Sequence, residues 1–90
     1  MTYNFRYNSL KNVELIASRW VGFEDIIEAI GMNDGLIDII EHPSSEYSHQ
    51  IILIVLWNDY IYSIPCVPEG ENTFFMKTII PSRKYKKLYS

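Results

Sequence analysis

Apolar residues between positions 10 and 20 recur near helical spacing, which predicts a first helix over residues 10–20. The apolar positions, which we expect to face the core, are Leu10, Val13, Ile16 or Ala17, and Trp20. The polar positions between them, expected at the surface, are Lys11, Glu14 and Ser18. Asn8 or Ser9 offers a side-chain acceptor for the free N–H groups at the start of this helix.

A second helix is predicted over residues 23–30, after a break at Gly22. Acidic residues in its first turn suit the positive end of the helix dipole. Its expected buried stripe consists of Phe23, Ile26, Ile27 and Ile30. Gly31 or Gly35 is expected to end the helix.

The pattern then changes to that of strands. Four strands are predicted, at residues 36–41, 50–57, 60–67 and 73–80, and residues 3–7 form a candidate edge strand. The stretch 50–57 is apolar on both faces, as in a central strand that is covered on both sides. Asn58 and Asp59 tolerate positive φ and suit a two-residue hairpin turn. Pro81 and Ser82 can open a short terminal helix.

The predicted order is β-α-α-β-β-β-β-α, which indicates an α+β fold. Two helices precede a four-stranded antiparallel meander, and a short helix follows it. The length of 90 residues suits one domain over residues 1–90.

Composition excludes several classes of protein. No apolar stretch approaches about 18 residues, so we expect no membrane span. The first residues lack a hydrophobic signal core, and the single cysteine, Cys66, rules out an internal disulfide, so we expect a cytoplasmic protein. Two histidines and one cysteine without regular spacing do not predict a metal site, and we expect no cofactor.

Basic residues gather at the end of the chain. Residues 1–76 hold three basic residues and all eleven acids, a net charge of −8, whereas residues 77–90 hold five basic residues and no acid. Such an asymmetry predicts a local site for an anion, and RNA is the anion that we favour. The acidic remainder of the chain leaves a basic protein partner open as an alternative.

Two residue types add candidate chemistry. His42, beside Glu41 and before a proline, could act as a general base or acid, although a loop residue bonded to nearby backbone is the simpler interpretation. The tyrosines that could stack on unpaired bases are Tyr60, Tyr62, Tyr85 and Tyr89. For Tyr60 and Tyr62, packing under a helix is the simpler alternative. Cys66 has no sequence neighbour that would activate it.

Three blocks of sequence resemble a known family. They are Tyr7-Asn-Ser-Leu-Lys-Asn12, Phe23-Glu-Asp25, and Lys77-Thr-Ile-Ile-Pro-Ser-Arg-Lys84 followed by Tyr89. In this order they resemble the BrnT-like toxins, small RelE/ParE-related ribonuclease toxins of bacterial type II toxin–antitoxin systems. The chain departs from the family pattern in three places. Asn8 replaces an acid, the histidine of the turn after the first helix is missing, and the family's strand basic residue aligns nearest Thr78 instead of Lys77.

The resemblance implies a metal-independent endoribonuclease that inhibits translation by cleaving RNA. The candidate catalytic residues are Lys77, Arg83 and His42. The candidate RNA-binding residues are Lys11, Arg19, Lys84, Lys86 and Tyr60. A solvated basic helix, and pairing of Lys11 and Arg19 with acids, are the alternatives for these cations.

The resemblance also implies a cognate antitoxin as partner, which would cover the basic site with an acidic segment, and a homodimer within the toxin–antitoxin complex. The alternative function is a non-catalytic protein-interaction or nucleic-acid-binding module of the same fold.

Overall fold

The computed structural model describes residues 3–47 and 49–89. Along this part of the chain the elements are β1 (Asn4–Tyr7), α1 (Ser9–Arg19), α2 (Phe23–Met32), β2 (Leu36–Glu41), the 3-10 turn η1 (Ser45–Tyr47), β3 (Ile51–Trp57), β4 (Tyr60–Pro68), β5 (Thr73–Met76), β6 (Ile80–Pro81) and α3 (Arg83–Tyr89). The α+β class and the order of the predicted elements are confirmed.

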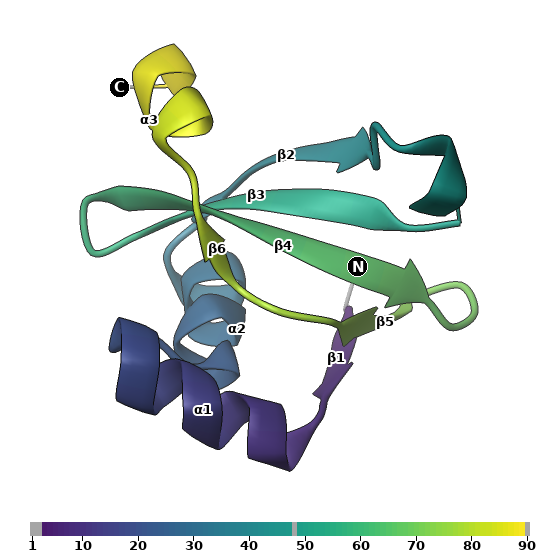
Figure 1. The fold of residues 1–90 in the computed structure, drawn as a ribbon, viewed down its shortest axis with the longest axis horizontal. Coiled ribbons are helices and arrows are strands. Elements are labelled where there is room, and N and C mark those ends of the chain that lie inside the picture. The colour runs from purple at the N-terminus through teal and green to yellow at the C-terminus, as the bar shows by residue number, and fades with distance from the viewer. Residues whose placement is uncertain (1–2, 48, 90) are drawn as a thin grey trace.

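The strands of the described residues form one six-stranded sheet in the order β1-β5-β4-β3-β2, with β6 paired to β4. β1 and β5 are parallel, while the other pairs are antiparallel. Figure 1 shows α1 and α2 on one face of this sheet and α3 on the other. The central position of β3 explains why its sequence is apolar on both faces.

The buried side chains of the described residues form a cluster on each face. The larger cluster lies under α1 and α2 and includes Leu15, Phe23, Leu53, Val55, Ile64, Cys66 and Met76. The smaller one consists of Ile52, Ile54 and Ile61, with Tyr85 of α3 packed against it. α3 therefore covers the part of this second sheet face that lies near Ile61.

Gly35, and not Gly31, marks the turn from α2 to the sheet. α2 continues through Gly31 and ends at Met32. A Cβ at Gly35 would lie 2.6 Å from the Leu56 carbonyl oxygen and 2.9 Å from that of Ala29. The close approach of these two backbone segments therefore requires a residue without a side chain.

The prediction of one continuous strand over residues 73–80 was wrong. β4 pairs Cys66 with Met76 but Ser63 with Ile80, so the two residues between them on β4 face the three residues 77–79. Pro65, one of those two, has no N–H to donate, while its carbonyl accepts from the Lys77 N–H at 2.8 Å. The result is a β-bulge, which leaves Lys77 exposed between buried Met76 and buried Ile79.

The prediction that the apolar side of the first helix faces the core was also wrong. Within α1 only Leu15 is buried. The large side chains of the predicted core face are exposed: Leu10 by 75%, Val13 by 64%, Ile16 by 51% and Trp20, the C-cap, by 86%. Hydrogen bonds hold the other side of α1 against the protein body. The Asn12 Oδ1 accepts from the Phe23 N–H at 2.8 Å, and an Arg19 Nη1 donates to the Ile79 carbonyl at 2.8 Å.

Asn12 acts as a remote cap for α2, because the N-cap residue Gly22 has no side chain. We expect Asn12→Ala to lower the free energy of unfolding by about 1–2 kcal/mol, since the Phe23 N–H loses its acceptor. Asn12→Asp keeps the acceptor and adds a charge favoured at a helix N-terminus, so it should stay near wild type. Denaturant unfolding of both variants checks this, and equal losses would contradict a capping role.

Candidate nucleic-acid interface

The face of the sheet opposite α1 and α2 carries a group of basic residues at the β1–β5 edge. Phe5 and Tyr7 of β1 pack against the larger core cluster, so Arg6 between them points to the opposite face. Arg6 is the cross-strand partner of Phe75 in the parallel β1–β5 pair. Lys77 follows two positions after Phe75, at the start of the bulge.

Both cations lie over the same aromatic ring. The Arg6 Cζ is 5.7 Å from the centroid of the Phe75 ring, and the Lys77 Nζ is 5.5 Å from it. Each distance is within the range of a cation–π contact. Phe75 itself is half-buried. We call Arg6, Phe75 and Lys77 the basic corner.

Glu69 contacts the basic corner from the β4–β5 turn. Its Oε1 is 2.8 Å from the Arg6 Nη1, and the two side chains are 35% and 63% exposed, respectively. A pair this exposed contributes little stability, because water screens it. Glu69 thus orients the guanidinium without burying it, and Arg6 stays accessible to an anionic ligand.

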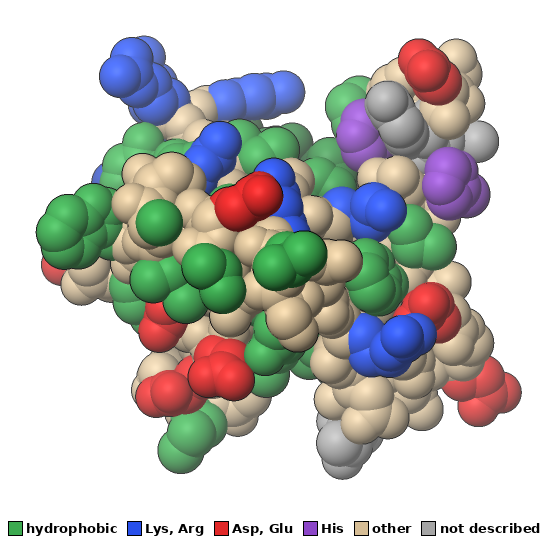
Figure 2. All heavy atoms as spheres, turned by 60° about the horizontal axis from the view of Figure 1, so that its bottom comes forward, with side chains coloured by type: hydrophobic (Ala, Val, Ile, Leu, Met, Phe, Trp, Pro, Cys, Tyr) green, Lys and Arg blue, Asp and Glu red, His purple; other side chains and the backbone are tan. Residues whose placement is uncertain are grey.

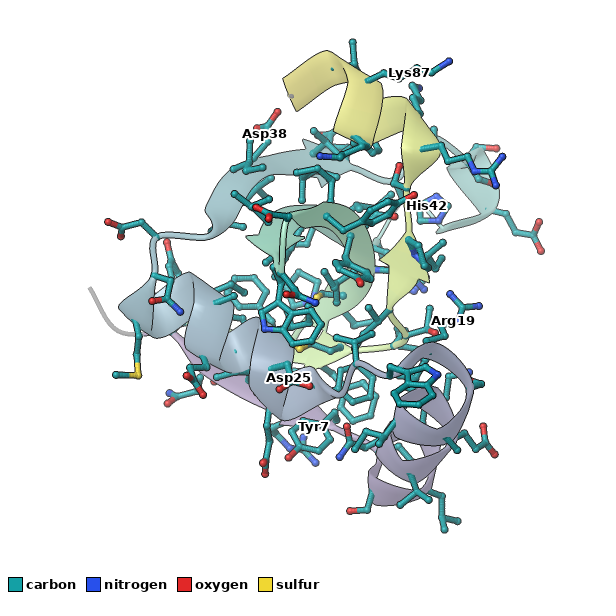
Figure 3. All side chains as sticks on the ribbon, turned by 90° about the vertical axis from the view of Figure 1, so that its left-hand side faces the viewer. Tyr7, Arg19, Asp25, Asp38, His42 and Lys87 are labelled. Carbon is teal, nitrogen blue, oxygen red and sulfur yellow. The ribbon has the colours of Figure 1, made fainter. Side chains whose placement is uncertain are left out.

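The cations of α3 lie on the same face but form a second group. The Ser82 N–H, just before α3, bonds to the Ile61 carbonyl, whereas Lys77 bonds to Pro65. Ile61 and Pro65 are four residues apart on β4, which corresponds to a distance of about 14 Å. Arg83 is exposed at the first position of α3, the Lys84 Nζ lies 5.5 Å from the Tyr85 ring, and Lys86 is half-buried. Lys87 points away from the sheet (Figure 3).

His42 lies at the other edge of the sheet from the basic corner. Its backbone N–H bonds to the Gln50 carbonyl at 3.2 Å, and its Nδ1 accepts from the Ser44 N–H at 3.2 Å. His42 follows β2, whereas Lys77 follows β5. These two strands are three positions apart in the sheet, so about 14 Å separates the two residues. These bonds fit the turn role, and His42 and Lys77 do not lie together.

The structure places Lys11 and Tyr60 away from the basic corner, whereas Arg19 bonds to the backbone two residues beyond Lys77. Lys11 is half-buried on α1, across the sheet from Phe75. Arg19, labelled in Figure 3, lies in the last turn of α1. Its Nη1 donates to the Ile79 carbonyl instead of pairing with the acids of α2. Tyr60 lies in the β3–β4 hairpin with its ring 5.5 Å from that of Tyr62. Along β4 it is seven residues, about 24 Å, from Val67, the partner of Phe75.

Known proteins were compared with the chain at three levels. No protein-family model matches it, and no curated protein sequence is significantly similar. The crystal structure of the Brucella abortus ribonuclease toxin BrnT is similar, with a TM-score of 0.65 and 14% sequence identity over 92% of this chain and 100% of that chain. The chain has the fold of BrnT. At this identity the likeness shows the fold alone, so the resemblance in the sequence blocks is confirmed at the level of the fold.

Within this BrnT fold, the sequence put forward Lys77 as a candidate site residue but not Arg6, which lies beside it over Phe75. The only signal for Arg6 was its place in an alternating segment, because the parallel pairing of β1 with β5 joins residues far apart in the chain. Phe75 was missed for the same reason. Figure 2 shows Lys and Arg side chains in separate groups, with acidic and hydrophobic side chains between them. The basic side chains therefore form local sites instead of one continuous basic surface, which agrees with the negative net charge of the chain.

Burial raises the pKa values of two further reactive side chains, Cys66 and Tyr7. Burial raises the pKa of the Cys66 thiol to about 12, which keeps it protonated and unreactive near neutral pH. Burial, followed by the nearby Glu24 carboxylate, raises the pKa of Tyr7.

No three His, Cys, Asp or Glu side chains of residues 3–47 and 49–89 gather as a metal-binding group. No helix in the described part of the chain is long and apolar enough to span a bilayer.

Proposed function

We propose that the chain is a ribonuclease toxin that binds single-stranded RNA across the basic corner and cleaves it without a metal ion. The BrnT fold, shared over 92% of the chain, carries the proposal. Its support in the chain itself is the pair of cations over the Phe75 ring. Two exposed cations beside one aromatic ring suit the phosphates of a single strand that passes over them.

The reaction would begin with attack of a ribose 2′-oxygen on the adjacent phosphorus. A base takes the 2′-hydroxyl proton, the P–O5′ bond breaks, and the leaving 5′-oxygen takes up a proton. Lys77 would stabilise the crowded phosphate, and support for this role is that its side chain is exposed and lies beside Phe75. Arg6 would grip a neighbouring phosphate through its planar guanidinium.

Arg83, Lys84 and Lys86 of α3 would extend the RNA path beyond the reacting phosphate. Arg83 is exposed and its backbone lies about 14 Å along the sheet from Lys77, so it would contact a different phosphate. His42, at a similar separation on another strand, would act on the same phosphate only if the RNA or the turn moved. Lys77 is therefore our first choice for the reacting centre.

The partner expected for such a toxin is an antitoxin with an acidic segment. Arg6 and Lys77 give such a segment two exposed cations, and Glu69 is the carboxylate that it would replace beside Arg6. A segment bound in this way would block RNA directly.

Salt dependence of RNA binding tests the interface. The logarithm of the association constant for single-stranded RNA should fall linearly with the logarithm of salt concentration, and Lys77→Ala should reduce the slope by about 0.7. Lys87→Ala, which removes a cation pointing away from the sheet, should leave the slope unchanged. The measurement uses fluorescence anisotropy with a labelled oligoribonucleotide in EDTA. Equal slopes for wild type and Lys77→Ala would contradict binding at the basic corner.

The exposed apolar side of α1 favours the second candidate, a non-catalytic interaction module of the same fold. This alternative predicts that the oligoribonucleotide remains intact in EDTA after long incubation with wild-type protein. The ribonuclease proposal predicts cleavage under the same conditions.

A further inference from the structure

α1 is amphipathic, but most of its apolar side chains face solvent instead of the core. With 3.6 residues per turn, Leu10, Val13 and Ala17 lie within about 40° of the direction opposite buried Leu15, and the exposed C-cap residue Trp20, with a left-handed φ of 62°, follows them at the end of the helix. We call these four residues the apolar stripe. Ala17 is exposed like the other three, and Figure 2 shows hydrophobic side chains at the surface on the side of the molecule that carries α1.

The helix cannot turn over to bury the apolar stripe in its own chain. Asn12 and Arg19 lie on the same side as Leu15, and their side chains bond to the Phe23 N–H and the Ile79 carbonyl. Turning α1 would break both bonds and expose Leu15. An apolar surface that is fixed outward in this way indicates an interaction site.

The stripe is self-complementary. Its spacing of three, four and three residues is that of the a and d positions of a coiled coil. It is also symmetric about position 15, so reversing the helix exchanges Leu10 with Trp20 and Val13 with Ala17. A second copy lying antiparallel would place Leu10 against the other copy's Trp20 and Val13 against its Ala17. These are the isologous contacts of a two-fold axis.

We propose that the chain forms a two-fold symmetric dimer in which α1 packs antiparallel against α1 of a second copy through the apolar stripe. The charges permit this arrangement. Lys11 and Arg19 lie toward the protein body, and Glu14 at the edge of the stripe would face the second copy's Ile16 instead of another acid. No like charges meet across the axis.

The area of the stripe sets the strength of the dimer. Leu10, Val13 and Trp20 of the stripe, together with Ile16 at its edge, expose on the order of 500 Å² per copy, given their exposed fractions. Two copies would bury roughly 1,000 Å², the lower limit of a biological interface. The dimer should therefore dissociate on dilution. It leaves the basic corner open on the opposite face of the sheet, so it does not depend on the proposed function.

Sedimentation of the purified chain over a range of concentrations tests the proposal with Leu10→Glu and Trp20→Lys. Both positions are exposed, and both new charges suit their end of the helix, so folding should be retained, as circular dichroism will check. We expect wild type to pass from monomer to dimer with concentration, and each variant alone to raise the dissociation constant by roughly tenfold or more.

An equimolar mixture of the two variants should dimerise more strongly than either alone. Antiparallel helices place the new carboxylate at position 10 of one copy beside the new ammonium at position 20 of the other. At the opposite end of the same interface, one native contact between Trp20 and Leu10 is kept. A mixture no stronger than the single variants overturns the antiparallel arrangement.

Leu88→Glu is the matched control, because Leu88 is 65% exposed on α3 and lies outside the stripe. It should dimerise like wild type. A wild-type chain that stays monomeric at every concentration overturns the proposal and points to a different protein as the occupant of the stripe.

Discussion

Phe23→Ala should lower the free energy of unfolding by about 3–5 kcal/mol, a large part of the stability of a chain this short. Phe23 is fully buried at the first position of α2, and its ring stacks on that of Tyr7 with centroids 4.9 Å apart. Removing the ring leaves a cavity where β1, α1 and α2 meet. The same residue also donates the N–H that Asn12 caps, so the backbone there cannot easily shift to fill the space.

Denaturant unfolding measures this loss, and Phe75→Ala is the matched control. Phe75 is half-buried at the sheet surface, so its truncation should cost clearly less. If both substitutions destabilise the chain equally, the core does not centre on the contact between α2 and β1.

Lys77→Ala should slow RNA cleavage by about 10²–10³-fold, the usual cost of removing one donor that stabilises the reacting oxyanion. The stability should hardly change, because Lys77 is exposed and its structural bond is made by the backbone N–H. Lys77→Arg keeps the charge beside Phe75 and should retain part of the rate. Single-turnover cleavage of a defined oligoribonucleotide measures all three proteins.

Lys87→Ala controls for the loss of positive charge and should cleave at the wild-type rate. Full activity in Lys77→Ala, together with loss of activity in Arg83→Ala, would move the reacting centre from the basic corner to α3. The two groups are far enough apart for the variants to distinguish them.

Local sequence patterns predicted the elements well, since each depends on neighbouring residues. The helices, the hairpin at Asn58–Asp59 and the doubly covered strand β3 were all predicted. Two features of the candidate site depend on distant residues. The parallel β1–β5 pairing brings Arg6 to Phe75, and Pro65 on β4 creates the bulge that separates β5 from β6. Both place side chains that periodicity cannot locate.

The first helix shows a different limit of sequence patterns. Periodicity identified its apolar face correctly, but periodicity does not say what covers that face. Asn12 and Arg19 decide its orientation through bonds to α2 and to the segment before β6. The apolar side of α1 therefore faces outward, and not toward the core as expected, because polar residues of the helix bond to distant backbone.

Induced expression in bacteria tests the central claim most directly, with growth and total RNA followed for wild type, Lys77→Ala and Arg83→Ala. Our account predicts that wild type arrests growth and degrades RNA, whereas Lys77→Ala, produced at the same level, does neither. Normal growth with intact RNA in cells that express folded wild-type protein would contradict the ribonuclease function.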